Sequence, residues 1–290
     1  MKKVIAIQSS PSRHWVGDGF PVRSLFSYDS GQTARVSPFL LLDYAGPAIF
    51  ERADKPRGVG DHPHRGFETV TLVYQGEVAH RDSTGQGGVI GPGDVQWMTA
   101  GSGILHQEFH SESFTQAGGM LEMVQLWVNL PAEHKMARPH YQAILNQDIP
   151  EVELPHSTGT VRVIAGSYGG ATGPAHTFSP MTVLDIWLTP GQSRINVPAG
   201  WNTLLVVLSG SVRINGDRFA EEAQLVILDR AGDYVDLEAS DQAKLLVLAG
   251  EPINEPVVGY GPFVMNTQDE IQQAIEDYKS GKFGRIPASN

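Results

Sequence analysis

Apolar residues recur along most of this chain in short runs with a two-residue period, the spacing typical of strands that bury one face. The alternation is clear in Val212 and Ile214 and again between Asp233 and Leu237. Turn-forming residues interrupt the runs, since the chain contains 32 Gly and 19 Pro. The pattern predicts an all-β protein made of many short antiparallel strands.

Only the last part of the chain has the pattern of a helix. Thr267 and Glu270 have the spacing of a capping box, in which each residue satisfies a backbone N–H of the other. Gly281 is typical of a helix end. A stripe of apolar residues at helical spacing lies between them, formed by Ile271, Ala274, Ile275 and Tyr278. We therefore expect a short C-terminal helix that docks on a barrel.

The strand pattern occurs twice. Residues 72–78 (LVYQGEV) match residues 206–212 (VVLSGSV), which sets an offset of 134 residues between the two copies. Duplication of a strand–turn–strand unit predicts two related antiparallel β-barrels of the jelly-roll type, packed together. We expect the first barrel in residues 1–131, a connecting region in residues 132–177, and the second barrel with the C-terminal helix in residues 178–290.

Composition limits the classes of function. The net charge of −11 and the pI near 5.3 argue against direct contact with nucleic acid or an anionic membrane. No apolar run approaches the roughly 18 residues needed to cross a bilayer, and the N-terminal apolar run is too short for a signal peptide. The chain has no cysteine, so disulfides and thiolate ligands are excluded. We expect a cytoplasmic protein.

Two short motifs carry the chemistry: His62-Pro63-His64 and His106-Gln107-Glu108. In a strand, residues i and i+2 point to the same face, so each motif directs two metal-ligand side chains one way. Three imidazoles and a carboxylate on facing strands form a site for a first-row metal with coordination positions left open. A closed structural site is the alternative, but such sites usually use thiolates in a tetrahedral set.

The duplication provides a test of this interpretation. At the offset of 134 residues, none of the four candidate ligands has a counterpart of the same type, because the aligned positions are Asn196, Pro198, Ser240 and Gln242. The flanking positions keep their character, with Gly66 aligned to Gly200 and Thr69 to Thr203. Residues needed for barrel packing should occur in both copies. The four candidates occur in one copy, which favours a functional role.

The chain resembles the pirin family of the cupin superfamily over nearly its whole length. The strings that carry the resemblance are residues 37–43 (SPFLLLD), 61–70 (DHPHRGFETV), 93–101 (GDVQWMTAG), 103–108 (GILHQE), 125–131 (QLWVNLP) and 274–278 (AIEDY). The resemblance implies a bicupin with one mononuclear iron in the N-terminal barrel. It also implies that His62, His64, His106 and Glu108 hold this metal. The ligand set alone also allows Mn, Ni, Cu or Zn, because the metal bound depends on availability as much as on the ligands.

The resemblance further implies flavonol (quercetin) 2,3-dioxygenase activity, in which dioxygen opens the ring and carbon monoxide is released. In this hypothesis Glu108 is the catalytic base that accepts the proton of the flavonol 3-hydroxyl. The alternative function is that of an iron-dependent, redox-sensing regulatory protein that binds a transcription factor or a metabolic enzyme. Redox-dependent capture of a partner without turnover would favour the alternative.

Four further residues have competing interpretations. Glu68 follows His64 at a spacing where many cupins place a carboxylate ligand, although Gly66 interrupts the strand between them. We favour Glu108 as the ligand. Arg65 could attract an anionic ligand or form an ordinary ion pair. The tryptophans at positions 97 and 127 could line an aromatic pocket or fill the core.

Overall fold

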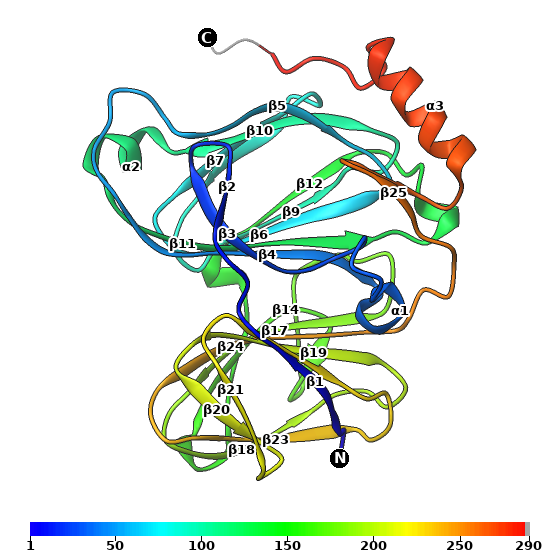
Figure 1. The fold of residues 1–290 in the computed structure, drawn as a ribbon. Coiled ribbons are helices and arrows are strands. Elements are labelled where there is room, and N and C mark those ends of the chain that lie inside the picture. The colour runs from blue at the N-terminus through cyan, green and yellow to red at the C-terminus, as the bar shows by residue number, and fades with distance from the viewer. Residues whose placement is uncertain (288–290) are drawn as a thin grey trace. The chain divides into compact units, whose positions relative to one another are not determined.

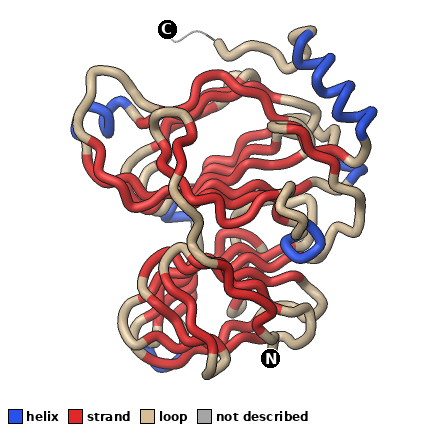
Figure 2. The backbone as a smooth tube through the Cα atoms, in the orientation of Figure 1, coloured by secondary structure: helices blue, strands red, loops and turns tan. Residues whose placement is uncertain are grey.

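The computed structural model describes residues 1–287 and shows a mostly β protein (Figures 1 and 2). The chain forms two compact units. Unit 1 comprises residues 1–12, 32–38 and 147–253, and unit 2 comprises residues 13–31, 39–146 and the segment from residue 254 onward. The predicted all-β fold with a C-terminal helix is confirmed.

Unit 2 contains two sheets that enclose one interior. The seven-stranded sheet consists, in spatial order, of β12 (His140–Ile144), β9 (Val95–Thr99), β6 (Phe67–Gln75), β11 (Gly119–Asn129), β4 (Phe39–Phe50), β3 (Phe20–Ser27) and β2 (His14–Val16). The four-stranded sheet consists of β5 (Gly58–His64), β10 (Ile104–His110), β7 (Val78–Asp82) and β8 (Gly87–Ile90). All named pairs are antiparallel. The two sheets remain separate, so the predicted barrel is an open sandwich of jelly-roll type.

Gly66 explains why the chain changes sheets after the first histidine motif. Strand β5 ends at His64 in the small sheet, and β6 begins at Phe67 in the large one. Gly66 adopts a positive φ of 88°, and a Cβ at this position would approach the Val264 carbonyl oxygen to 2.0 Å. Only glycine allows this turn and close approach.

Short helices and one hairpin complete unit 2. These are α2 (Glu112–Ala117), the 3₁₀ turn η1 (Ala132–His134), the hairpin of β25 (Val258–Tyr260) with β26 (Phe263–Met265), and α3 (Gln268–Lys279). The predicted capping box is confirmed, because both reciprocal bonds between Thr267 and Glu270 are present. Ile271 and Ala274 of the apolar stripe are buried in a cluster with Phe263. The helix therefore docks on unit 2.

Unit 1 repeats the two-sheet arrangement. Its large sheet is β1 (Val4–Gln8), β22 (Gln224–Leu228), β19 (Asn202–Ser209), β24 (Ala243–Gly250), β17 (Met181–Leu188), β14 (Gly159–Ala165) and β13 (Glu151–Glu153). Its small sheet is β18 (Gly191–Asn196), β23 (Tyr234–Ala239), β20 (Ser211–Ile214) and β21 (Arg218–Glu221). The remaining elements are α1 (Thr33–Val36), the pair β15 (Ser167–Tyr168) and β16 (Ala171–Thr172), and the 3₁₀ turns η2 (Asn146–Asp148) and η3 (Pro155–Ser157).

The compact units are not continuous along the chain, unlike the segments expected from the repeat. The first strand, β1, pairs with β22 and so completes the large sheet of unit 1. The C-terminal helix, expected with the second barrel, belongs to unit 2. Strand pairing and burial place β1 in unit 1 and the helix in unit 2. A linear alignment of the two copies contains no information on either. Within residues 1–287, no helix has the length and apolar character required to cross a membrane.

Candidate metal centre

The structure brings together the three predicted histidines inside unit 2. Strands β5 and β10 are antiparallel neighbours, and His62 lies directly opposite His106 in their register. The ring centroids are 4.1 Å apart for His62 and His106, and 4.8 Å apart for His64 and His106. One nitrogen of each of the three rings lies within 4.8 Å of the others. The i, i+2 spacing thus directs all three imidazoles to one point.

A second, overlapping group contains Glu108 and a residue that the sequence analysis missed, His80. Ligand atoms of His80, His106 and Glu108 also lie within 4.8 Å of one another, and all three side chains are buried. His80 lies on β7, opposite Glu108 on β10. The duplication contained the signal for this residue, since His80 aligns with Ile214 at the offset of 134 residues.

Two ring nitrogens of the cluster have no hydrogen-bond partner, and both are fully buried. They are Nδ1 of His64 and Nε2 of His106. Burial, reinforced by the neighbouring His62, lowers the pKa of both rings well below the usual value of histidine. The rings are therefore neutral, and each presents an unshared lone pair, which is the form of histidine that binds a metal. The donor set fits a divalent first-row metal.

Hydrogen bonds fix the orientation of the remaining ring atoms. Nδ1 of His62 lies 2.8 Å from the Gly60 carbonyl oxygen, which leaves its Nε2 for a metal. Nδ1 of His106 lies 3.3 Å from Nδ1 of His80, whose Nε2 lies 3.2 Å from Oδ2 of Asp82. If His80 donates to Asp82, its Nδ1 is an acceptor, and two donors lie 3.3 Å from it: Nδ1 of His106 and Nε2 of Gln96. This chain selects the His106 tautomer whose Nε2 lone pair is free.

Replacing His80 with phenylalanine is expected to weaken metal binding by about 10- to 100-fold, the usual effect of losing a group that orients a ligand. Competition with a chromophoric chelator measures the affinity. Long-range ¹H–¹⁵N NMR of the metal-free protein reports the His106 tautomer, which should lose its Nδ1–H preference. His110→Phe, at another buried histidine, is the control. Unchanged affinity and tautomer in His80→Phe would contradict the role of His80.

Glu108 is held at the inner end of the site by two side-chain donors. Its Oε1 accepts from Nε2 of Gln96 at 2.9 Å, and it shares the proton of the Thr71 hydroxyl, at 3.3 Å, with Oε1 of Gln125. The Tyr141 hydroxyl donates to Oε1 of Gln96 and so fixes the amide. Burial, with the nearby charge of Glu108, raises the pKa of Tyr141 to about 12, so its hydroxyl remains a donor at neutral pH. Among residues 1–287, no donor contacts Oε2 of Glu108.

A cavity of about 320 Å³ opens onto the cluster. Most of its wall is apolar, and its polar lining is confined to few side chains, the usual composition of a small-molecule site. The lining residues are Val16, Phe20, Val22, Asp43, Val59, His62, His64, Glu108, Met123, Gln125, Trp127, Gly261 and Pro262. The cavity is thus long enough to reach from the histidines to strands β3 and β4, and it can admit a planar aromatic molecule.

Glu68, the competing carboxylate, lies on the opposite face of the large sheet. Its Oε1 accepts from the Thr99 hydroxyl at 2.8 Å, whereas Thr71 on the same strand contacts Glu108. In an unbroken strand Glu68 would point to the same side as His64. The turn at Gly66 ends the strand after His64, so Glu68 points away from the site. Glu68 is fully buried and is not a solvated strand residue. It belongs to neither potential metal group.

Burial raises the pKa of Glu68 to about 7, which predicts a pH-dependent stability. Between pH 4.5 and 7 the folded state keeps a proton that the unfolded state releases, so the free energy of unfolding should fall as the pH rises through this window. The loss amounts to at most about 3 kcal/mol. Glu68→Gln should flatten this slope in denaturant titrations of the metal-free protein. An equal slope in Glu68→Gln and in Glu133→Gln, at an exposed position, would disprove the assignment.

Of the three remaining candidate residues, two are buried outside the cavity wall and one lines the cavity. Arg65 is buried, pairs with Asp277 at 3.0 Å and donates to the Ser102 carbonyl oxygen, so it holds helix α3 and does not line the cavity. Trp97 is completely buried and also stays outside the cavity wall. Trp127 lines the cavity, with its ring 5.3 Å from that of His64. Only Trp127 can contact a ligand there.

Strand pairing corrects the alignment of the two copies. In unit 1, Ile214, the counterpart of His80, pairs with Leu237 as His80 pairs with Glu108 in unit 2. From this anchor, Ile195 pairs with Val235 as His62 pairs with His106. The residues that replace the four candidate ligands are therefore Ile195, Val197, Val235 and Leu237, all in the apolar core. The expected counterparts at a constant offset were wrong, because the connections between strands differ in length. The second copy lacks the ligands, as predicted.

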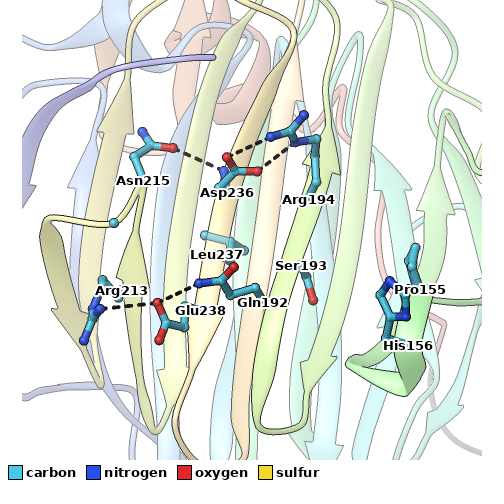
Figure 3. Close-up of a pocket in the computed structure, with 11 residues that line it drawn as sticks. Pro155, His156, Gln192, Ser193, Arg194, Arg213, Asn215, Asp236, Leu237 and Glu238 are labelled. Atoms are coloured by element: carbon cyan, nitrogen blue, oxygen red, sulfur yellow. Dashed lines mark hydrogen bonds and ion pairs between the residues drawn. The ribbon is translucent and has the colours of Figure 1, made fainter.

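The concavities of unit 1 show a different chemistry. The pocket in Figure 3 lies over the small sheet, where charged side chains pair across strands. Arg194 forms two bonds of 2.8 and 3.0 Å with Asp236, and Arg213 lies 3.4 Å from Glu238. In the described part of the chain, no group of metal-ligand side chains occurs in unit 1. The candidate site of this protein is therefore the cavity of unit 2.

Comparisons with known proteins identify relatives of this chain. Residues 19–128 match the family model described as Pirin, and residues 183–284 match the Pirin C-terminal cupin domain. A Pseudomonas aeruginosa protein provisionally named quercetin 2,3-dioxygenase is 60% identical, over 98% of this chain and 99% of its own. Pirin-like protein 2 of Arabidopsis thaliana is 42% identical, over 92% of this chain and 81% of its own.

A solved structure shows the same fold. The crystal structure of quercetin 2,3-dioxygenase from Acinetobacter baumannii has a TM-score of 0.96 and 54% identity to this chain. It covers 99% of this chain and 100% of its own. The two-sheet units and their connections are thus shared along the entire length.

Proposed function

The chain belongs to the pirin family, and from this premise we propose that it binds one iron ion and cleaves flavonols as a 2,3-dioxygenase. One observation carries the proposal. Two neutral imidazoles have a buried nitrogen without a partner: His64 lines the apolar cavity together with the carboxylate Glu108, and the ring of His106 lies 4.8 Å from that of His64. Relatives whose names include quercetin 2,3-dioxygenase support the choice of substrate.

We propose that His62, His64, His106 and Glu108 hold the metal. Three neutral imidazoles and one carboxylate leave a divalent ion with a net positive charge and open positions. Bound iron supplies Lewis acidity and the one-electron chemistry that reaction with dioxygen requires. The apolar wall excludes bulk water from the reacting atoms.

Glu108 is the proposed base. Gln96 and Thr71 both donate to Oε1, so Oε2 is the oxygen that would bind the metal and, once loosened from it, would accept the proton of a substrate hydroxyl. Transfer of the flavonol 3-hydroxyl proton to Glu108 raises the electron density of the ring that dioxygen attacks. Trp127 and Phe20 of the cavity wall then hold the aromatic rings in place.

Metal identity is tested by loading the metal-free protein separately with Fe(II), Mn(II), Ni(II), Cu(II) and Zn(II). Metal content and the rate of quercetin consumption are measured for each preparation. We expect one ion per chain and the highest rate with iron. A higher rate with another ion at equal occupancy would reject iron while leaving the dioxygenase assignment intact.

A further inference from the structure

A row of polar side chains crosses the otherwise apolar cavity face of the large sheet in unit 2. Side chains at registered positions of neighbouring strands lie side by side on one face. The strand register aligns five such residues on five adjacent strands: Ser24, Asp43, Gln125, Thr71 and Gln96. On one side the row borders Val22, Ala45, Met123 and Val73, which are all buried and apolar. The row is thus a polar stripe within an apolar wall.

The inner half of the row serves the metal centre. Thr71 and Gln96 both donate to Glu108, as described above. Their hydrogen-bonding groups are occupied by protein partners. The metal centre therefore explains the presence of only two of the five polar residues.

The outer half has hydrogen-bonding groups to spare. Oδ1 of Asp43 accepts from the Ser24 hydroxyl at 2.5 Å, and no described residue donates to its Oδ2. Oε1 of Gln125 lies 3.1 Å from the Thr71 hydroxyl and shares the one proton of that hydroxyl with Glu108, and no described residue accepts from the Gln125 amide N–H groups. Both side chains line the cavity. The cavity wall therefore presents a free acceptor beside a free donor.

Such a pair selects for a hydroxyl group. In the empty cavity, water can satisfy Asp43 and Gln125, but a planar ligand that fills the apolar space displaces this water. A ligand without a polar group there leaves both side chains unpaired, whereas a hydroxyl donates to Asp43 and accepts from Gln125. Burial also raises the pKa of Asp43.

The register fixes the distance between this pair and the metal centre. Asp43 lies two strands from Thr71, which contacts Glu108. Two strand spacings amount to roughly 10 Å. Hydrogen bonds of about 2.8 Å at both ends leave roughly 5 Å between the two ligand hydroxyls, so these hydroxyls cannot be on adjacent atoms of one ring.

We propose that Asp43 and Gln125 form a recognition site for a second hydroxyl of the substrate. The ligand class is a planar aromatic compound that offers one hydroxyl to Glu108 and another, roughly 5 Å or more from the first, to Asp43. This inference rests on the proposed function. Asp43 and Gln125 determine specificity in it and take no part in the chemical step.

Two flavonols test the inference. Quercetin carries hydroxyls on its outer rings, whereas 3-hydroxyflavone has only the hydroxyl assigned to Glu108. Dissociation constants of both are measured without oxygen, on iron-loaded wild type, Asp43→Leu, Asp43→Asn and Gln125→Leu. We expect Asp43→Leu and Gln125→Leu to raise the quercetin to 3-hydroxyflavone ratio of dissociation constants by about 10-fold. Asp43→Asn, which keeps an acceptor, should raise it less.

Controls separate this inference from the proposed function. Asp54→Asn, at an exposed loop position, should leave the ratio at the wild-type value. Iron content and 3-hydroxyflavone binding show that each variant is folded. An unchanged ratio in Asp43→Leu, with 3-hydroxyflavone still cleaved by the wild type, would overturn the hydroxyl site alone. Failure of the iron-loaded wild type to bind either flavonol would overturn both proposals.

Discussion

Replacing His106 with alanine is expected to abolish metal binding at micromolar metal and, with it, all turnover. His106 is the central residue of the cluster, since it belongs to both groups of potential ligands. Its Nε2 is one of the two buried nitrogens without a partner. Loss of this ligand should raise the metal dissociation constant by at least about 100-fold, which corresponds to roughly 3 kcal/mol.

The metal content after dialysis and the dissociation constant from calorimetry measure this effect. Thermal unfolding gives an independent readout, because a metal that binds only the folded state raises the midpoint of the wild type. The same metal should leave the midpoint of His106→Ala unchanged. His14→Ala, at an exposed position, is the matched control. Stoichiometric, tightly bound metal in His106→Ala would contradict the proposed site.

Glu108→Gln is expected to lower kcat by about 10²- to 10⁴-fold, the usual contribution of a general base. Glutamine has nearly the same shape and can still accept at Oε1 from Gln96 and Thr71. The three imidazoles remain, so part of the metal should be retained. The variant therefore separates loss of the base from loss of the site.

Anaerobic rapid-mixing spectroscopy tests this prediction directly, because the deprotonated flavonol absorbs at longer wavelength than the neutral form. The wild type should convert bound quercetin to the anion, and Glu108→Gln should leave it neutral. Glu68→Gln is the matched control, since Glu68 is an equally buried carboxyl on the other face of the same sheet. Wild-type turnover in Glu108→Gln would exclude Glu108 as the base.

Local sequence patterns were sufficient to locate most of the site. The spacing of His62 and His64, and of His106 and Glu108, places each pair on one strand face, and the structure brings all four side chains to one interior. The helix at the C-terminus was equally local, since its capping box and apolar stripe are encoded within a few residues. Features of this kind need only strand or helix periodicity.

Features that depend on strand register could not be predicted in the same way. His80 joins the site because β7 lies beside β10, and Asp43 joins Gln125 because β4 lies beside β11. These neighbours are far apart in the sequence, and register is set by burial of whole faces. Comparison of the two copies partly replaces this missing information, because a histidine at position 80 aligned with an apolar residue, Ile214, indicates a functional role. The comparison fails at a constant offset wherever a loop differs in length between the copies.

The most direct test is to reconstitute the metal-free protein with Fe(II) without oxygen, then add quercetin and ¹⁸O₂. Quercetin consumption, carbon monoxide release and the mass of the ring-opened product are measured together. We expect one carbon monoxide per quercetin and two ¹⁸O atoms in the product, with no reaction in the metal-free protein or in His106→Ala. Stoichiometric iron without quercetin cleavage would contradict the dioxygenase assignment and favour the redox-sensing regulatory function.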